Sequence, residues 1–65
     1  MDALSIIAAL GGLSETARKA GAPVSTVQYW QDKGRIPAWR EAQIREALVA
    51  DGLDPAAYLA PKEAA

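Results

Sequence analysis

Apolar residues recur at helical spacing in short segments of this chain, and glycine or proline closes each segment. The first segment covers residues 2–10, and its apolar positions fall at i, i+3, i+4 and i+7: Ala3, Ile6, Ile7 and Leu10. This stripe predicts a helix, with Asp2 at its N-terminal cap. Gly11-Gly12 follows the stripe and marks the end of the predicted helix.

Two further helices are predicted on either side of Gly21. The first runs from about residue 13 to 20 and has Leu13, Ala17 and Ala20 on one face. Gly21 stands where a helix often ends with a left-handed residue. The second helix covers about residues 24–33, because Pro23 fixes its own φ at the start and Gly34 follows the end.

The last third of the chain predicts one longer helix and one short helix. Residues 37–50 have Pro37 in the first turn and an inner apolar stripe of Ile44, Ala47 and Leu48. The short helix follows Asp54 as N-cap and Pro55 as first helical residue, and residues 61–65 are predicted to fray. We therefore expect one all-α domain over residues 1–60, a compact bundle of four to five short helices.

The composition excludes several classes of function. The chain has 65 residues with no cysteine and no histidine, so it has neither a disulfide nor a Cys/His zinc site. Its Gly-Gly pair lacks the Lys-Ser/Thr continuation of a phosphate-binding loop, and its carboxylates are scattered. We expect no enzyme, no metal and no cofactor. The longest aliphatic run, residues 4–10, is too short to span a membrane, which favours a cytoplasmic protein.

The net charge of −1 conceals an uneven distribution. Residues 18–40 carry five of the seven basic residues and one of the eight acidic ones, a local charge of +4. Residues 41–65 carry two basic and five acidic residues, a local charge of −3. A polyanion is therefore expected to contact the middle of the chain while the remainder faces water.

The two helices around Gly21 have the spacing of a helix-turn-helix. A small residue, Ala17, lies four positions before Gly21, and the apolar residues Val27 and Trp30 lie six and nine positions after it. A small residue lets two helices cross closely, and the later apolar pair anchors the second helix to the core. In such a unit the second helix enters the DNA major groove by its N-terminal part.

Residues 4–50 resemble the phage repressor and Cro-type helix-turn-helix family, whose fold is lambda repressor-like, and most closely small Cro-like and YdaS-like prophage proteins. The resemblance is carried by matching positions: Gly11-Gly12, Ala17, Gly21, Val27, Trp30, Ile36-Pro37 and Ile44. The chain departs from the pattern at Thr16, where Leu is common, and at Ala22-Pro23, where Val-Ser is common.

The resemblance implies a role for each exposed residue of the second helix. The implied base contacts are Val24, Ser25, Gln28 and Tyr29, and a phosphate is the alternative partner of Tyr29. The implied contacts to the DNA backbone are Arg18, Thr26, Lys33, Arg35 and Arg40.

Several of these residues also have a purely structural interpretation. Val24 is explained equally well as a residue that closes the edge of the core. Thr26 is explained equally well as a residue that stabilises the first turn of its helix. Arg18 and Lys19 also suit the C-terminal end of a helix dipole. Trp39 is expected to cover the core, with a dimer contact or a place beside a phosphate as the alternatives. Arg40 has stacking on a tryptophan as an alternative to DNA.

The apolar residues Leu53, Tyr58 and Leu59 lie beyond the motif. They either fold back over the first helix or contact a second subunit. A small core often gains stability by association, so we expect a homodimer. A dimer would place two recognition helices about 34 Å apart and bind an inverted-repeat operator.

The sequence thus favours a bacterial, nucleoid-associated regulator that binds double-stranded DNA, most simply a repressor. An activator that contacts RNA polymerase through Glu41 and Glu46 is a variant of this hypothesis. Two alternatives remain: an excisionase- or MerR-like DNA-bending factor with a β-wing after Pro37, and an antitoxin-type module that binds protein.

Overall fold

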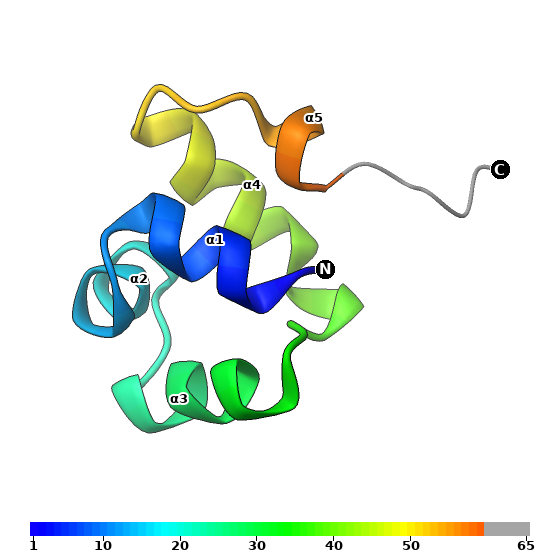
Figure 1. The fold of residues 1–65 in the computed structure, drawn as a ribbon. Coiled ribbons are helices and arrows are strands. Elements are labelled where there is room, and N and C mark those ends of the chain that lie inside the picture. The colour runs from blue at the N-terminus through cyan, green and yellow to red at the C-terminus, as the bar shows by residue number, and fades with distance from the viewer. Residues whose placement is uncertain (60–65) are drawn as a thin grey trace, which may run out of the picture.

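The computed structural model describes residues 1–59 and contains only short helices, which pack as a small all-α bundle, as the sequence predicts. In chain order these are α1 (Ala3–Leu10), α2 (Leu13–Ala20), α3 (Val24–Lys33), the 3-10 turn η1 (Ala38–Arg40), α4 (Glu41–Ala50) and α5 (Pro55–Tyr58). Figure 1 shows α3 along one edge of the bundle, with α1, α2 and α4 to one side of it. The tail predicted to fray, residues 61–65, lies outside the described residues.

Left-handed glycines end the helices where the sequence predicts. Gly21 follows α2 with a φ of 71°, and Gly34 follows α3 with a φ of 79°. Both residues are C-caps, a position at which a Cβ atom is disfavoured by the positive φ. After Gly21, the amide of Ala22 donates to the carbonyl of Ala17 at 3.0 Å, which closes the turn between the two helices.

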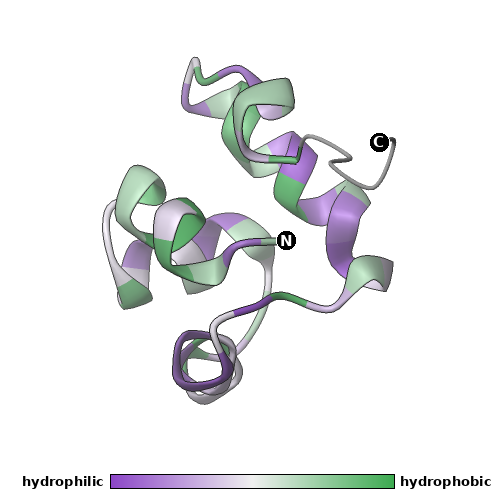
Figure 2. Cartoon of the chain, turned by 45° about the vertical axis from the view of Figure 1, so that its right-hand side comes forward, coloured by the Kyte–Doolittle hydropathy of each residue, from purple (hydrophilic) through white to green (hydrophobic). Residues whose placement is uncertain are grey.

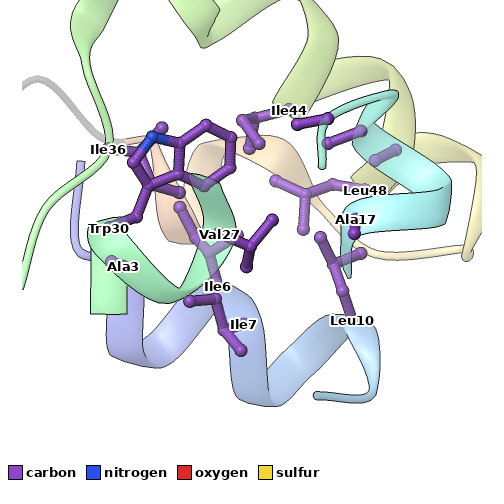
Figure 3. Close-up of a cluster of buried hydrophobic side chains, with 13 residues drawn as sticks. Ala3, Ile6, Ile7, Leu10, Ala17, Val27, Trp30, Ile36, Ile44 and Leu48 are labelled. Atoms are coloured by element: carbon purple, nitrogen blue, oxygen red, sulfur yellow. The ribbon is translucent and has the colours of Figure 1, made fainter. Parts of the chain in front are cut away.

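The core lies between the inner faces of α1 to α4. Val27 and Trp30 of α3 are almost fully buried, and Figure 3 shows the Trp30 indole beside Ile36 and Ile44. The other buried apolar residues follow the predicted stripes: Ala3, Ile6, Ile7, Leu10, Ala17, Ala20, Ala22, Ala47 and Leu48. The helix predicted to face DNA is therefore fixed to the core through the two residues that the motif assigns to that task.

Thr16, the departure from the family pattern in α2, is fully buried. Its hydroxyl donates to the carbonyl of Ile7 in α1 at 3.4 Å, a long hydrogen bond. The same carbonyl also accepts the amide of Gly12 at 2.9 Å. A threonine thus fits a core position because a helix-end carbonyl is within reach of its hydroxyl.

The N-terminus is paired with the connection that follows α3. Asp2 and Arg35 form an isolated antiparallel bridge. The amide of Ile36 donates to the carbonyl of Met1 at 3.0 Å, and the amide of Ala3 donates to Gly34 at 3.4 Å. This pairing fixes the backbone immediately after α3.

The prediction of a single helix over residues 37–50 is wrong for the first turn of that helix. Pro37 is extended, with a ψ of 142°, and is followed by η1 before α4 begins at Glu41. The α-helical geometry is interrupted at Arg40, whose ψ of 2° lies outside the α region. The amide of Arg40 donates to the carbonyl of Pro37 at 3.0 Å, as in a 3-10 turn. The segment after Pro37 is still helical, so residues 37–59 do not form the β-wing that the excisionase- or MerR-like alternative needs.

The end of the described chain folds back onto the bundle. The Asp54 side chain caps α5 by accepting the amide of Ala56 at 3.1 Å. Leu53, Tyr58 and Leu59 are half-buried and pack against the chain's own core, which is one of the two arrangements left open by the sequence. Among the described residues, no helix is long and apolar enough to cross a membrane.

Candidate nucleic-acid interface

Helix α3 presents a polar face to solvent opposite its two core residues. Ser25, Gln28 and Tyr29 are exposed on this face, which lies away from Val27 and Trp30 on the helical wheel. Figure 2 shows α3 nearly end-on at the margin of the bundle, with its polar residues coloured purple. The structure therefore leaves three of the four predicted base-contacting side chains together on an open surface.

The fourth predicted base contact, Val24, is 45% exposed and so does not close the core. Thr26, a predicted backbone contact, is half-buried at the start of the helix. Pro23 precedes both residues as the N-cap and supplies no side-chain hydrogen bond, as its missing hydroxyl requires. The first amides of α3 consequently have no side-chain cap.

The described cations divide into two groups according to whether a carboxylate neutralises them. Arg18 pairs with Glu15, and Arg45 pairs with Glu41. Lys19 pairs with Asp51 at 2.6 Å. Three cations have no described carboxylate within 4.0 Å: Lys33, Arg35 and Arg40. Lys33 and Arg35 lie at the end of α3 and just beyond it, where they line one surface depression with Tyr29. The Arg40 guanidinium lies between Trp30 and Trp39 instead.

Arg18 differs from the other predicted backbone contacts because its charge is compensated on its own helix. Its guanidinium donates to the carboxylate of Glu15 one turn earlier. This hydrogen bond, with the charge attraction, lowers the pKa of Glu15 below its ordinary value of 4.5 and raises the pKa of Arg18. Both side chains are well exposed, so the pair is a surface interaction that solvent screens.

Lys19 ties three helices together. Its ammonium donates to the carbonyl of Leu10 at the end of α1 at 2.8 Å and to the carboxylate of Asp51 after α4 at 2.6 Å. The side chain is 19% exposed. Lys19 is thus a structural residue in this fold. The sequence shows it only as a lysine in the last turn of a helix, which predicts an interaction with the helix dipole and not these two contacts.

Trp39 does not cover the core as predicted, because it is 73% exposed. Arg40 occupies the place beside the buried indole instead. Its guanidinium carbon lies 5.4 Å from the Trp30 ring centre and 4.3 Å from the Trp39 ring centre, and its Nη1 donates to Gln43 at 2.9 Å. Trp39 therefore stacks on the outside of Arg40, the alternative that the sequence left open for this arginine.

A hollow of about 250 Å³ lies at the end of α3 and is lined by Tyr29, Lys33, Arg35 and Pro37. The Lys33 ammonium lies 5.5 Å from the centre of the Tyr29 ring. The structure thus brings together one predicted base contact and two predicted backbone contacts around one surface depression. Pro37 is a wall that sequence reasoning did not assign.

Asp32 is a further residue of α3 for which the sequence pattern predicts no role. It is exposed and lies one turn after Gln28 on the outward face of α3. The i, i+4 spacing alone would have placed it there. Within residues 1–59, no group of three or more acidic or metal-binding side chains is arranged to hold a metal ion.

Comparisons of the chain with protein-family models, with curated proteins and with solved structures find no match.

Proposed function

We propose that this chain is a sequence-specific regulator that binds double-stranded DNA by inserting α3 into the major groove. In this proposal α2, the Gly21 turn and α3 act as a helix-turn-helix, and Ser25, Gln28 and Val24 contact base edges. The observation that carries the proposal is the separation of charges. Lys33 and Arg35 have no described carboxylate partner and follow the exposed polar face of α3, whereas Arg18, Lys19 and Arg45 are neutralised within the chain. Arg40 is not counted with them, because it stacks between Trp30 and Trp39.

Charge separation of this kind favours a polyanion over a neutral or a basic partner. Each phosphate that a Lys or Arg neutralises releases counterions from DNA, which supplies much of the binding free energy. A polar helix next to such charges adds the hydrogen-bonding groups that distinguish base pairs in the major groove. The two features adjoin where Tyr29, Lys33 and Arg35 line one depression. The outward face of α3 also carries one carboxylate, Asp32, beside these two cations.

The chain is further proposed to act as a homodimer on an inverted-repeat operator in the bacterial cytoplasm. Occlusion of a promoter is the simplest mode of action, and contact with RNA polymerase through the exposed carboxylates of Glu41 and Glu46 is the activator variant. Glu41 is already paired with Arg45, which makes Glu46 the more available of the two.

The test is to select DNA from a random duplex pool with the purified full chain and to titrate the selected site at several salt concentrations. We expect one motif to emerge, with an affinity that falls steeply as salt rises because phosphate contacts dominate. Gln28→Ala is expected to weaken preference at one base pair. Arg35→Ala is expected to weaken all sequences alike and to reduce the salt slope by about one.

Arg45→Ala is the matched control, since it removes a cation of α4 that Glu41 already neutralises and should leave DNA affinity nearly unchanged. Absence of any DNA binding at low salt would reject the proposal and favour the antitoxin-type alternative. Equal effects of Gln28→Ala on all sequences would reject the base-reading role of Gln28 alone.

A further inference from the structure

The hollow at the end of α3 combines the groups that bind an oxyanion. It is lined by Tyr29, Lys33, Arg35 and Pro37, which carry a phenol hydroxyl, an ammonium, a guanidinium and an apolar ring. Its volume of about 250 Å³ is far above the roughly 10–15 Å³ that one water molecule needs, which leaves room for a phosphate group. Two cations and a hydroxyl donor can together satisfy several oxygens of one tetrahedral anion.

The fold sets the backbone positions of these residues, whereas the side chains of Tyr29, Lys33 and Arg35 are exposed to solvent. Tyr29 and Lys33 are four residues apart on one helix face, and the ammonium lies 5.5 Å from the ring centre. The backbone of Arg35 pairs with Asp2, and its amide donates to the carbonyl of Trp30 at 3.2 Å. The backbone that carries these side chains is thus ordered before binding, which lowers part of the entropy cost.

No described carboxylate neutralises the hollow. Asp2 is the bridge partner of Arg35, but its carboxylate accepts the hydroxyl of Ser5 at 2.6 Å instead of forming an ion pair. Neither Lys33 nor Arg35 has a described carboxylate within 4.0 Å. The hollow therefore retains two positive charges for an external anion.

From this geometry we propose that the hollow binds one phosphate of the DNA backbone, and that Tyr29 donates its hydroxyl to that phosphate and does not read a base. This inference rests on the proposed function and refines it, because it selects the phosphate over the base as the partner of Tyr29. The Tyr29 hydroxyl, the Lys33 ammonium and the Arg35 guanidinium then fix the register of α3 in the groove, while Ser25 and Gln28 remain for the bases.

The first test uses Tyr29→Phe, which removes the hydroxyl and keeps the ring under Lys33. Affinity is measured for the selected DNA site and for an unrelated duplex of equal length. We expect a loss of about three- to tenfold on both duplexes, with an unchanged salt slope, because the hydroxyl carries no charge. Lys33→Met should instead reduce the salt slope by about one.

Loss of affinity on the selected site alone would make Tyr29 a base contact and overturn the inference. An unchanged affinity on both duplexes would also overturn it.

A second test adds inorganic phosphate to the ¹⁵N-labelled chain and follows the amide signals at constant ionic strength. Shifts at residues 33–36 that weaken in Lys33→Met support the anion site. A chain that shows these shifts but binds no DNA would reject the proposed function and keep the anion site. Absence of shifts at residues 33–36 in a chain that binds DNA would overturn the anion site alone.

Discussion

At the scale of single residues, Thr16 shows how a polar side chain is accommodated in a small apolar core. It is fully buried, and its one hydrogen bond, to the Ile7 carbonyl, is long at 3.4 Å. That carbonyl keeps a second donor, the Gly12 amide at 2.9 Å. Removing the hydroxyl therefore leaves no buried acceptor without a partner, which is the usual source of large losses in stability.

This reasoning predicts opposite outcomes for two substitutions at the same site. Thr16→Val keeps the shape and removes a buried hydroxyl, so the free energy of unfolding should stay unchanged or rise by up to about 1 kcal/mol. Thr16→Ser keeps the hydroxyl and removes a buried methyl group, which should cost about 0.5–1.5 kcal/mol. Urea unfolding of the three proteins measures both effects. A lower stability for Thr16→Val than for Thr16→Ser would mean that the long hydrogen bond matters more than packing.

At the scale of helices, neighbouring cations on α2 have different tasks. Lys19 reaches the end of α1 and the residue after α4, and its side chain is 19% exposed. Arg18 is exposed and contacts only Glu15 on its own helix. Local sequence could not separate the two, because both stand in the last turn of α2, where the dipole favours either. The distinction depends on where α1 and α4 end in space.

Lys19→Met is therefore expected to destabilise the fold by about 1–3 kcal/mol, since it removes two charge-assisted hydrogen bonds between helices. Arg18→Met is the matched control and should shift the urea midpoint little, because solvent already screens its pair. High salt should narrow the difference between the two variants only slightly, as the Lys19 contacts are partly buried. Equal destabilisation by both substitutions would contradict the conclusion that Lys19 holds α1, α2 and α4 together.

The helix boundaries could be predicted largely from glycines and apolar stripes, because Gly21 and Gly34 act locally. The start of α4 could not. Pro37 is compatible with either a helical first turn or an extended residue, and the choice depends on Arg40 inserting beside Trp30. The exposure of Trp39 follows from the same contact. Both wrong predictions, the start of α4 and the burial of Trp39, therefore concern a tertiary contact that local sequence does not reveal.

At the scale of the whole molecule, the candidate site was only partly predictable. The exposed positions on α3 follow from helical period, so Ser25 and Gln28 could be placed from the sequence. The compensation of Arg18 and the hollow behind Tyr29 could not, because each depends on which side chains meet in three dimensions. The pairing of Asp2 with Arg35 also joins positions far apart in the chain. It holds the connection after α3, whose cations the proposed function uses.

Under the proposed function, the predicted homodimer is the property of the whole molecule that would most directly set the DNA target. Leu53, Tyr58 and Leu59 are already half-buried on the chain's own core. Apart from Trp39 and the residues of α3, the large apolar side chains exposed among the described residues are Leu4 and Val49, which a second chain could cover. If two chains associate, the unfolding midpoint in urea should rise with protein concentration, because dilution favours the unfolded monomer. Sedimentation equilibrium should then give twice the mass of one chain, and the selected DNA should carry two inverted half-sites about one helical turn apart. A midpoint that is constant over a hundredfold range of concentration, together with a single unrepeated DNA motif, would establish instead that one chain binds alone.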